Sequence, residues 1–135
     1  LRVVRPLDPL KAKHLGRALK QLAEEGTASV FKPMIGPDWT IGVVGNLQLD
    51  VIADRIRTEY GVQVQFEKIE LLTARWVESD CEKALKTFID SNKTSIARDH
   101  DDVIVFLARN TWHLGKTTEE WKQLKFNKIK EQALS

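Results

Sequence analysis

A strand, a short glycine turn, a helix and a second strand follow one another within residues 39–67. Trp39–Val44 is rich in β-branched residues, which favour a buried strand. Gly45-Asn46 interrupts this strand, and a helix should follow and end at Gly61, because a left-handed residue after the last turn is nearly free of strain only in glycine. Residues 62–66 then alternate between apolar and polar, as in a half-buried strand. The helix places these residues on one apolar face: Leu49, Ile52, Ala53, Ile56 and Tyr60.

The first 38 residues supply the elements that complete this unit. Arg2–Arg5 and Ala28–Phe31 are predicted strands. Between them a helix should begin at Asp8-Pro9, because aspartate accepts hydrogen bonds from free amides and proline fits the first helical position. Its apolar stripe is formed by Leu15, Ala18, Leu19, Leu22 and Ala23, and Gly26 ends it. The order strand, helix, strand, strand, helix, strand predicts an α+β protein with a ferredoxin-like βαββαβ core and both helices on one sheet face.

The second half of the chain should extend this core with further strands and helices. Thr73–Glu78 and Val103–Ala108 are predicted strands, and the second is continuously apolar, which suits burial on both faces. Ser79 with Glu82, and Thr117 with Glu120, each match a capping box, which predicts a helix after each. We expect one domain over residues 1–135, with a core of residues 1–70 and a packed C-terminal strand/helix extension of residues 71–135.

Three ordered blocks of the sequence resemble one protein family. Gly42-Val43-Val44-Gly45-Asn46-Leu47-Gln48-Leu49-Asp50-Val51 is similar to the Gly-X-Val-Gly-X-Leu-Gln-hydrophobic-acidic-Val stretch of peptide chain release factor 3 proteins. Asp8–Gly26 resembles the first helix of that family's third domain, and Thr73-Ala74-Arg75-Trp76-Val77-Glu78 matches its Thr-Ala-Arg-Trp-Val-Glu block. The family usually has Asp-Gly-Gly-Asp where this chain has Asp99-His100-Asp101-Asp102. Losing two glycines restricts that loop's backbone and calls into question any left-handed turn that the family uses there.

The resemblance covers essentially the whole chain and implies a part in translation termination. It implies a parent GTPase that uses GTP and Mg²⁺ and promotes dissociation of class-I release factors from the ribosome. The GTP-binding motifs would lie outside this chain, which would be the non-catalytic C-terminal (third) domain. That domain would dock on the small-subunit side, against rRNA and ribosomal protein, as a cytoplasmic monomer. Leu1 is not a start methionine, so we expect the chain to be cut from a longer one.

Basic residues are the candidate ribosome contacts. Arg75 and Trp76 should face opposite ways in an alternating strand, so we expect Trp76 in the core and Arg75 directed outward, where a guanidinium can bind phosphate. Lys32 is a further candidate, although exposed lysines often only solvate a surface. A basic tail supplies the rest, with Lys122 and Lys125 as candidate contacts beside Lys128 and Lys130.

Two other motifs suggest different functions. Gly115-Lys116-Thr117 ends like a phosphate loop, but Asn110 replaces that motif's first glycine, so we expect a loop leading into a helix cap. An RNA-recognition-motif-like module has the same βαββαβ order and stacks bases on aromatics of its central strands. Phe31, Trp39 and Phe66 lie on predicted strands, although the Lys/Arg-Gly-Phe-X-Phe signature is missing. This RNA-binding module is the alternative function.

Composition excludes few classes of protein. The net charge of +2 is too small to identify a nucleic-acid partner, and no apolar run reaches the roughly 20 residues of a membrane span. The single Cys81 excludes an internal disulfide and fits a reducing cytoplasm. His14, His100 and His113 are scattered without metal-ligand spacing, and a site of His113 with Asp101 or Asp102 has no local support. We therefore predict no catalytic, GTP-binding or metal-binding residues in this chain.

Overall fold

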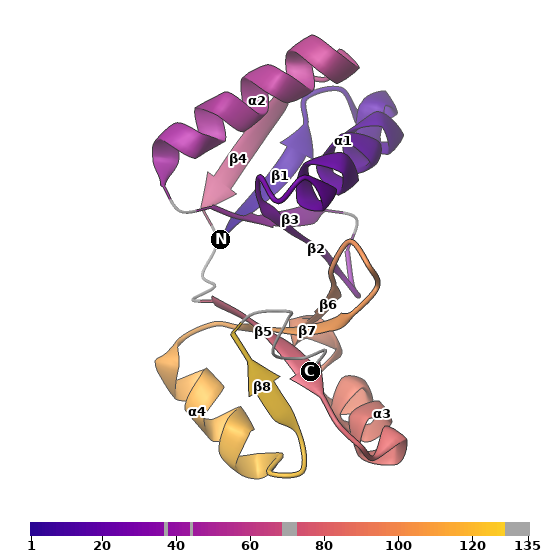
Figure 1. Ribbon diagram of the computed structural model, residues 1–135, viewed down its shortest axis with the longest axis vertical. Helices are drawn as coiled ribbons and strands as arrows, with labels where there is room; N and C mark the ends of the chain where they lie inside the picture. The colour runs from indigo at the N-terminus through magenta and orange to yellow at the C-terminus, as the bar shows by residue number, and fades with distance from the viewer. Residues whose placement is uncertain (37, 44, 69–72, 129–135) are drawn as a thin grey trace. The chain divides into compact units, whose positions relative to one another are not determined.

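The structure is a computed structural model that describes residues 1–36, 38–43, 45–68 and 73–128. The chain divides into two compact units: Leu1–Lys32 with Pro37–Ile69, and Pro33–Gly36 with Glu70–Ser135. Each unit combines helices with antiparallel strands (Figure 1), which confirms the predicted α+β class. That residues 1–135 form one domain, with a core of residues 1–70 and a packed extension of residues 71–135, stays a prediction.

The first unit has the ferredoxin-like topology. Its strand order is β4-β1-β3-β2, and β1 pairs with β3 and β4, and β2 with β3, all antiparallel. Both helices lie on one face of this sheet (Figure 1), so the predicted βαββαβ arrangement is confirmed. The elements are β1 (Arg2–Pro6), a 3-10 helix (Pro9–Lys11), α1 (Ala12–Glu24), β2 (Ser29–Pro33), β3 (Trp39–Gly42), α2 (Asn46–Tyr60) and β4 (Val64–Lys68).

Local sequence signals explain where the two helices of this unit begin and end. The Asp8 carboxylate accepts a hydrogen bond from the Leu10 amide at 3.0 Å, and Pro9 begins the 3-10 helix that leads into α1. Gly61 ends α2 with φ of +67°, and its N–H donates to the Arg57 carbonyl at 3.0 Å. Both predicted signals are confirmed.

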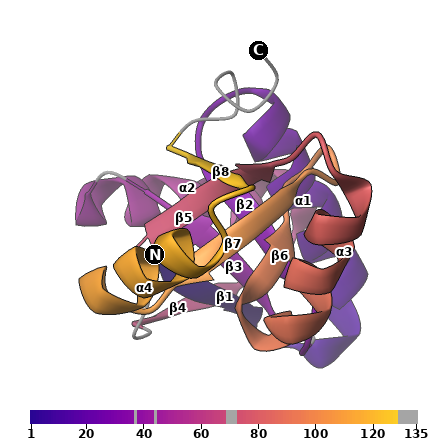
Figure 2. The ribbon, with the colours of Figure 1, turned by 90° about the horizontal axis from the view of Figure 1, so that it is seen from below.

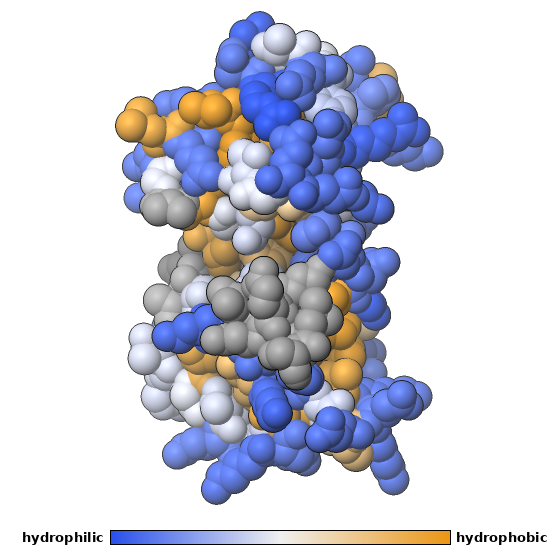
Figure 3. Space-filling view, in the orientation of Figure 1, coloured by the Kyte–Doolittle hydropathy of each residue, from blue (hydrophilic) through white to orange (hydrophobic). Residues whose placement is uncertain are grey.

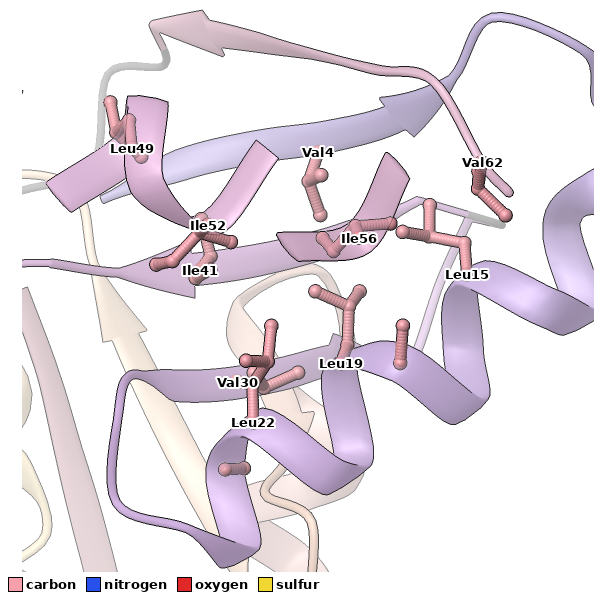
Figure 4. Close-up of a cluster of buried hydrophobic side chains, with 12 residues drawn as sticks. Val4, Leu15, Leu19, Leu22, Val30, Ile41, Leu49, Ile52, Ile56 and Val62 are labelled. Carbon is pink, nitrogen blue, oxygen red and sulfur yellow. The ribbon is translucent and has the colours of Figure 1, made fainter. Parts of the chain in front are cut away.

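The core of the first unit lies between its helices and its sheet (Figure 4). Every member of the predicted α1 stripe is buried, and α2 contributes Leu49, Ile52 and Ile56. Ala53 and Tyr60, also predicted on this face, are only partly buried. The strands supply the other side of the cluster, with Val4, Val30 and Ile41, and Val62 closes it after α2.

The second unit has the strand order β6-β7-β5-β8, again with antiparallel neighbours. Its two helices cover the same sheet face (Figures 1 and 2) and enclose a cluster centred on Phe88. The Phe88 ring centroid lies 5.8 Å from that of Phe106, 5.2 Å from that of Trp121 and 5.6 Å from that of Phe126. The elements are β5 (Thr73–Glu78), α3 (Glu82–Ser91), a 3-10 helix (Lys93–Ser95), β6 (Ile96–Arg98), β7 (Ile104–Ala108), α4 (Thr111–Glu120) and β8 (Lys125–Asn127).

Both predicted capping boxes were wrong. Helix α3 begins at Glu82 with Cys81 as its N-cap, and the Ser79 hydroxyl instead accepts a hydrogen bond from the Cys81 amide at 3.0 Å, in the turn before the helix. Helix α4 begins six residues before Thr117, because the Asn110 side chain caps it by accepting from the His113 amide at 2.7 Å. Gly115 lies inside α4 and obscured it in the sequence, since glycine disfavours a helix interior.

Candidate functional site

Arg75 lies on the helix-covered face of the second unit's sheet. Its cross-strand neighbour is Phe106, and Val77 follows on the same side, and both belong to the buried cluster. The predicted outward direction of Arg75 was therefore wrong: alternation requires that Arg75 and Trp76 differ, but not which of them faces the helices. The Arg75 side chain is half-buried, and its Nη1 donates to the Thr73 hydroxyl at 2.9 Å and the Ala74 carbonyl at 3.0 Å. Its role as a ribosome contact stays a prediction.

Trp76 points to the opposite face of the sheet, where its side chain is hydrogen-bonded to Asp99. The indole N–H donates to one Asp99 carboxylate oxygen at 2.9 Å, while the other oxygen accepts from the Asp101 and Val103 amides, each at 2.9 Å. Asp99 is only 6% exposed, so these donors compensate for its burial. The carboxylate thus organises the turn between β6 and β7 and ties it to β5.

The Asp99–Asp102 turn does contain a left-handed residue. Asp102 has φ of +62° and is the one non-glycine residue with positive φ in the described ranges. Its N–H donates to the Asp99 carbonyl at 3.0 Å, and its own carbonyl accepts from Arg98 at 3.1 Å. His100 and Asp101, which replace the two glycines of the resembling family, do not have positive φ. The left-handed residue is Asp102, which corresponds to the last aspartate of the family's Asp-Gly-Gly-Asp run, so neither substitution falls on it.

The three candidate lysines are all exposed but occupy different places. Lys32 lies on β2 in the first unit, with its Nζ 5.2 Å from the centroid of the Trp39 ring. Lys125 is the first residue of β8, opposite Glu78 on β5. Lys122 follows α4, on the surface described next. Lys128 is exposed as well, and Lys130 falls outside the described residues.

Beside Lys122, the exposed face of α4 carries residues that were not predicted as contacts from the sequence. Trp112 is 68% exposed, and the Lys116 Nζ lies 4.9 Å from the centroid of its ring. Lys116 also lies 3.9 Å from a carboxylate oxygen of Glu120. We call the shallow depression here the Trp112 hollow; it is lined by Trp112, Gly115, Lys116, Thr118, Glu119 and Lys122. The spacing of Trp112, Gly115 and Glu119 would place them on one face of a helix. We did not use this spacing, because the sequence predicted a helix only after Thr117.

The opposite face of α4 is structural. His113 is 9% exposed, its ring stacks edge-on against Phe106 with centroids 5.0 Å apart, and its Nδ1 accepts from the Arg109 amide at 3.1 Å. Burial, helped by the charges of Arg109 and Lys116, lowers the pKa of His113 below its ordinary value, so the neutral ring is favoured. The hydrogen bond to Nδ1 and the ring contact with Phe106 fix the orientation of the imidazole within the fold.

The phosphate-loop alternative is excluded at Gly115-Lys116-Thr117. A phosphate loop wraps backbone amides around the anion before its helix begins. Here residues 111–120 already form α4, and Thr117 is buried within it. The loop that we expected at this point was therefore wrong too.

The RNA-recognition-like alternative lacks its stacking surface. Val4, in the buried cluster, pairs with Trp39 on one side and with Phe66 on the other, so both rings lie on the helix-covered face. Phe31 is 1% exposed. None of the three aromatics offers an open ring on the sheet face that such modules use.

Four further features of the described residues bear on function. Within those ranges, no group of three or more His, Cys, Asp or Glu side chains could hold a metal ion. Cys81 is exposed with a free thiol. As far as the chain is described, none of its helices combines the length and the apolar character that crossing a membrane requires. Hydrophobic side chains gather over the N-terminal part of α2 (Figure 3), where Leu47 is 82% and Val51 58% exposed.

These features define an α+β protein with a ferredoxin-like unit followed by a second α+β unit, each built on four strands. Residues 1–118 match the family described as Class II release factor RF3, C-terminal domain. The chain belongs to this family, and its role lies in translation termination. The resemblance carried by Gly42–Val51 and Thr73–Glu78 is thereby confirmed.

Proposed function

We propose that this chain is a docking domain that binds the ribosome and does no chemistry of its own. The family match carries the proposal, because release factors act on the ribosome. Exposed cationic side chains at Lys32, Lys122 and Lys125 are suited to rRNA phosphates, and Arg75 keeps guanidinium nitrogens without a partner among the described residues. The domain would dock on the small-subunit side, against rRNA and ribosomal protein, as a cytoplasmic monomer.

In this proposal, the GTP and Mg²⁺ site belongs to the rest of the parent protein. The chain relays the nucleotide state by rigid-body movement between two arrangements on the ribosome, one of which favours departure of the class-I release factor. The helical Gly115-Lys116-Thr117 and the structural His113 support a role without catalysis.

Deleting this chain from the full-length protein tests the proposal. Intrinsic GTP binding should remain, whereas ribosome-stimulated GTP hydrolysis and release of the class-I factor from post-termination ribosomes should be lost. Arg75→Gln should weaken ribosome association, and Lys20→Gln, at an exposed position on α1, is the control. Undiminished class-I factor release by the truncated protein would refute the proposal. Normal release by Arg75→Gln would exclude only Arg75 as a ribosome contact.

A further inference from the structure

The Trp112 side chain projects into solvent from α4. The other face of this helix is buried at His113 and Thr117. The other residues around the Trp112 hollow are small, polar or charged, and each of them is exposed. The centre of a protein–protein interface is usually depleted of lysine and glutamate, whereas Lys116, Glu119 and Lys122 border this ring. An open ring bordered by lysines instead resembles the way single-stranded nucleic acid is bound, with bases on aromatic faces and phosphates on cations.

Gly115 gives an independent reason to regard this surface as a binding site. A glycine in the interior of an exposed helix destabilises it, and a Cβ added here would meet nothing within 4 Å. No packing contact therefore requires glycine at this position. Its missing side chain keeps the hollow beside the Trp112 ring open, so that a flat group can approach the helix backbone.

We propose that the Trp112 hollow binds an unpaired base of single-stranded RNA. The base stacks on the Trp112 ring above Gly115, and its flanking phosphates contact Lys116 and Lys122. The Lys116 side chain is 53% exposed, so its ammonium can leave the ring for a phosphate as the base takes its place. Glu119 accepts a hydrogen bond from the amino group of the base, which favours cytosine over uracil.

The choice of RNA as the ligand rests on the proposed ribosome docking. The charged side chains around the hollow determine how the affinity should depend on salt concentration. Glu119 and Glu120 lie beside Lys116 and Lys122, so the hollow is nearly neutral and stacking supplies most of the affinity. Two phosphate contacts give a slope of about −1.4 in the logarithm of the binding constant against that of salt concentration. Binding by counterion release over a broad basic surface would give a steeper slope.

Fluorescence anisotropy with a fluorescein-labelled 12-nucleotide oligo(C) RNA tests this inference. Trp112→Ala should weaken binding roughly 5- to 150-fold, the range for losing one stacked base, whereas Trp112→Phe should keep most of it. Gly115→Ala should raise the melting temperature and yet weaken binding, because the methyl group would lie where the base approaches the helix backbone. Leu10→Ala, which removes an 88% exposed side chain from the first unit, is the control and should change nothing.

Three results would overturn the inference. They are equal oligo(C) affinity for wild type and Trp112→Ala, unchanged affinity for Gly115→Ala, and Trp112-dependent binding of RNA-free ribosomal proteins in the absence of RNA binding. Sedimentation with ribosomes separates this inference from the docking proposal. If wild type and Trp112→Ala sediment equally well, docking stands and the hollow is not the contact; if neither sediments, docking itself fails, and the anisotropy measurement still decides on the hollow.

Discussion

Ile56→Ala is the sharpest test of the core that holds the first unit together. Ile56 is 1% exposed and projects from α2 into the layer between the helices and the sheet, near Leu15 and Val62 (Figure 4). The substitution removes three carbons, worth about 2.4 kcal/mol at ~0.8 kcal/mol each. The remaining cavity adds to this transfer term, so the free energy of unfolding should fall by about 2–5 kcal/mol. That loss is a large fraction of an ordinary domain's stability.

Val51→Ala on the same helix is the matched control. Val51 is 58% exposed, so removing its methyl groups should change the free energy of unfolding by less than about 0.5 kcal/mol. Urea unfolding followed by fluorescence checks both variants, and Trp39 is the one tryptophan of the sequence that lies in the first unit. Equal shifts in midpoint for Ile56→Ala and Val51→Ala would mean that the assigned buried face of α2 is wrong.

Three further predictions concern the second unit, each measured by its unfolding. Asp102→Gly should stabilise it by up to about 1 kcal/mol, because glycine adopts φ of +62° without strain, and destabilisation would show that the Asp102 side chain has a role of its own. Asp99→Ala should cost at least about 2 kcal/mol, since the Trp76 indole and two amides lose a charged acceptor; a loss below about 0.5 kcal/mol would contradict this. The lowered pKa of His113 means that the unfolded chain binds a proton first, so stability should fall as pH drops below about 6.5 and stay unaffected by this group above it. His113→Gln should reduce that pH dependence, and an unchanged slope would exclude His113 as its cause.

Local signals made the first unit predictable from the sequence. The α1 stripe, the Asp8 cap and the left-handed Gly61 each depend on contacts within a few residues, so pattern and structure agree. The predicted strand Trp39–Val44 is shorter in the structure, where β3 ends at Gly42; Val44 lies outside the described residues.

The second unit was harder to predict because tertiary contacts decide its details. Alternation along β5 separates Arg75 from Trp76, but the packing of Val77 and Phe106 under the helices determines which side is covered. Helix α4 was missed because Gly115 has low helix propensity, and only the Asn110 cap and the burial of His113 show its true start. That error also hid the exposed spacing of Trp112 and its neighbours.

Binding of the purified 135-residue chain to purified post-termination ribosomes would show whether this chain is the docking domain. We expect saturable binding, about one chain per ribosome, that is displaced by the full-length release factor. We also expect excess chain to slow release of the class-I factor by the full-length protein, because both compete for the same docking surface. The absence of saturable binding, or binding that the full-length factor does not displace, would contradict the assignment of this chain as the ribosome-docking domain.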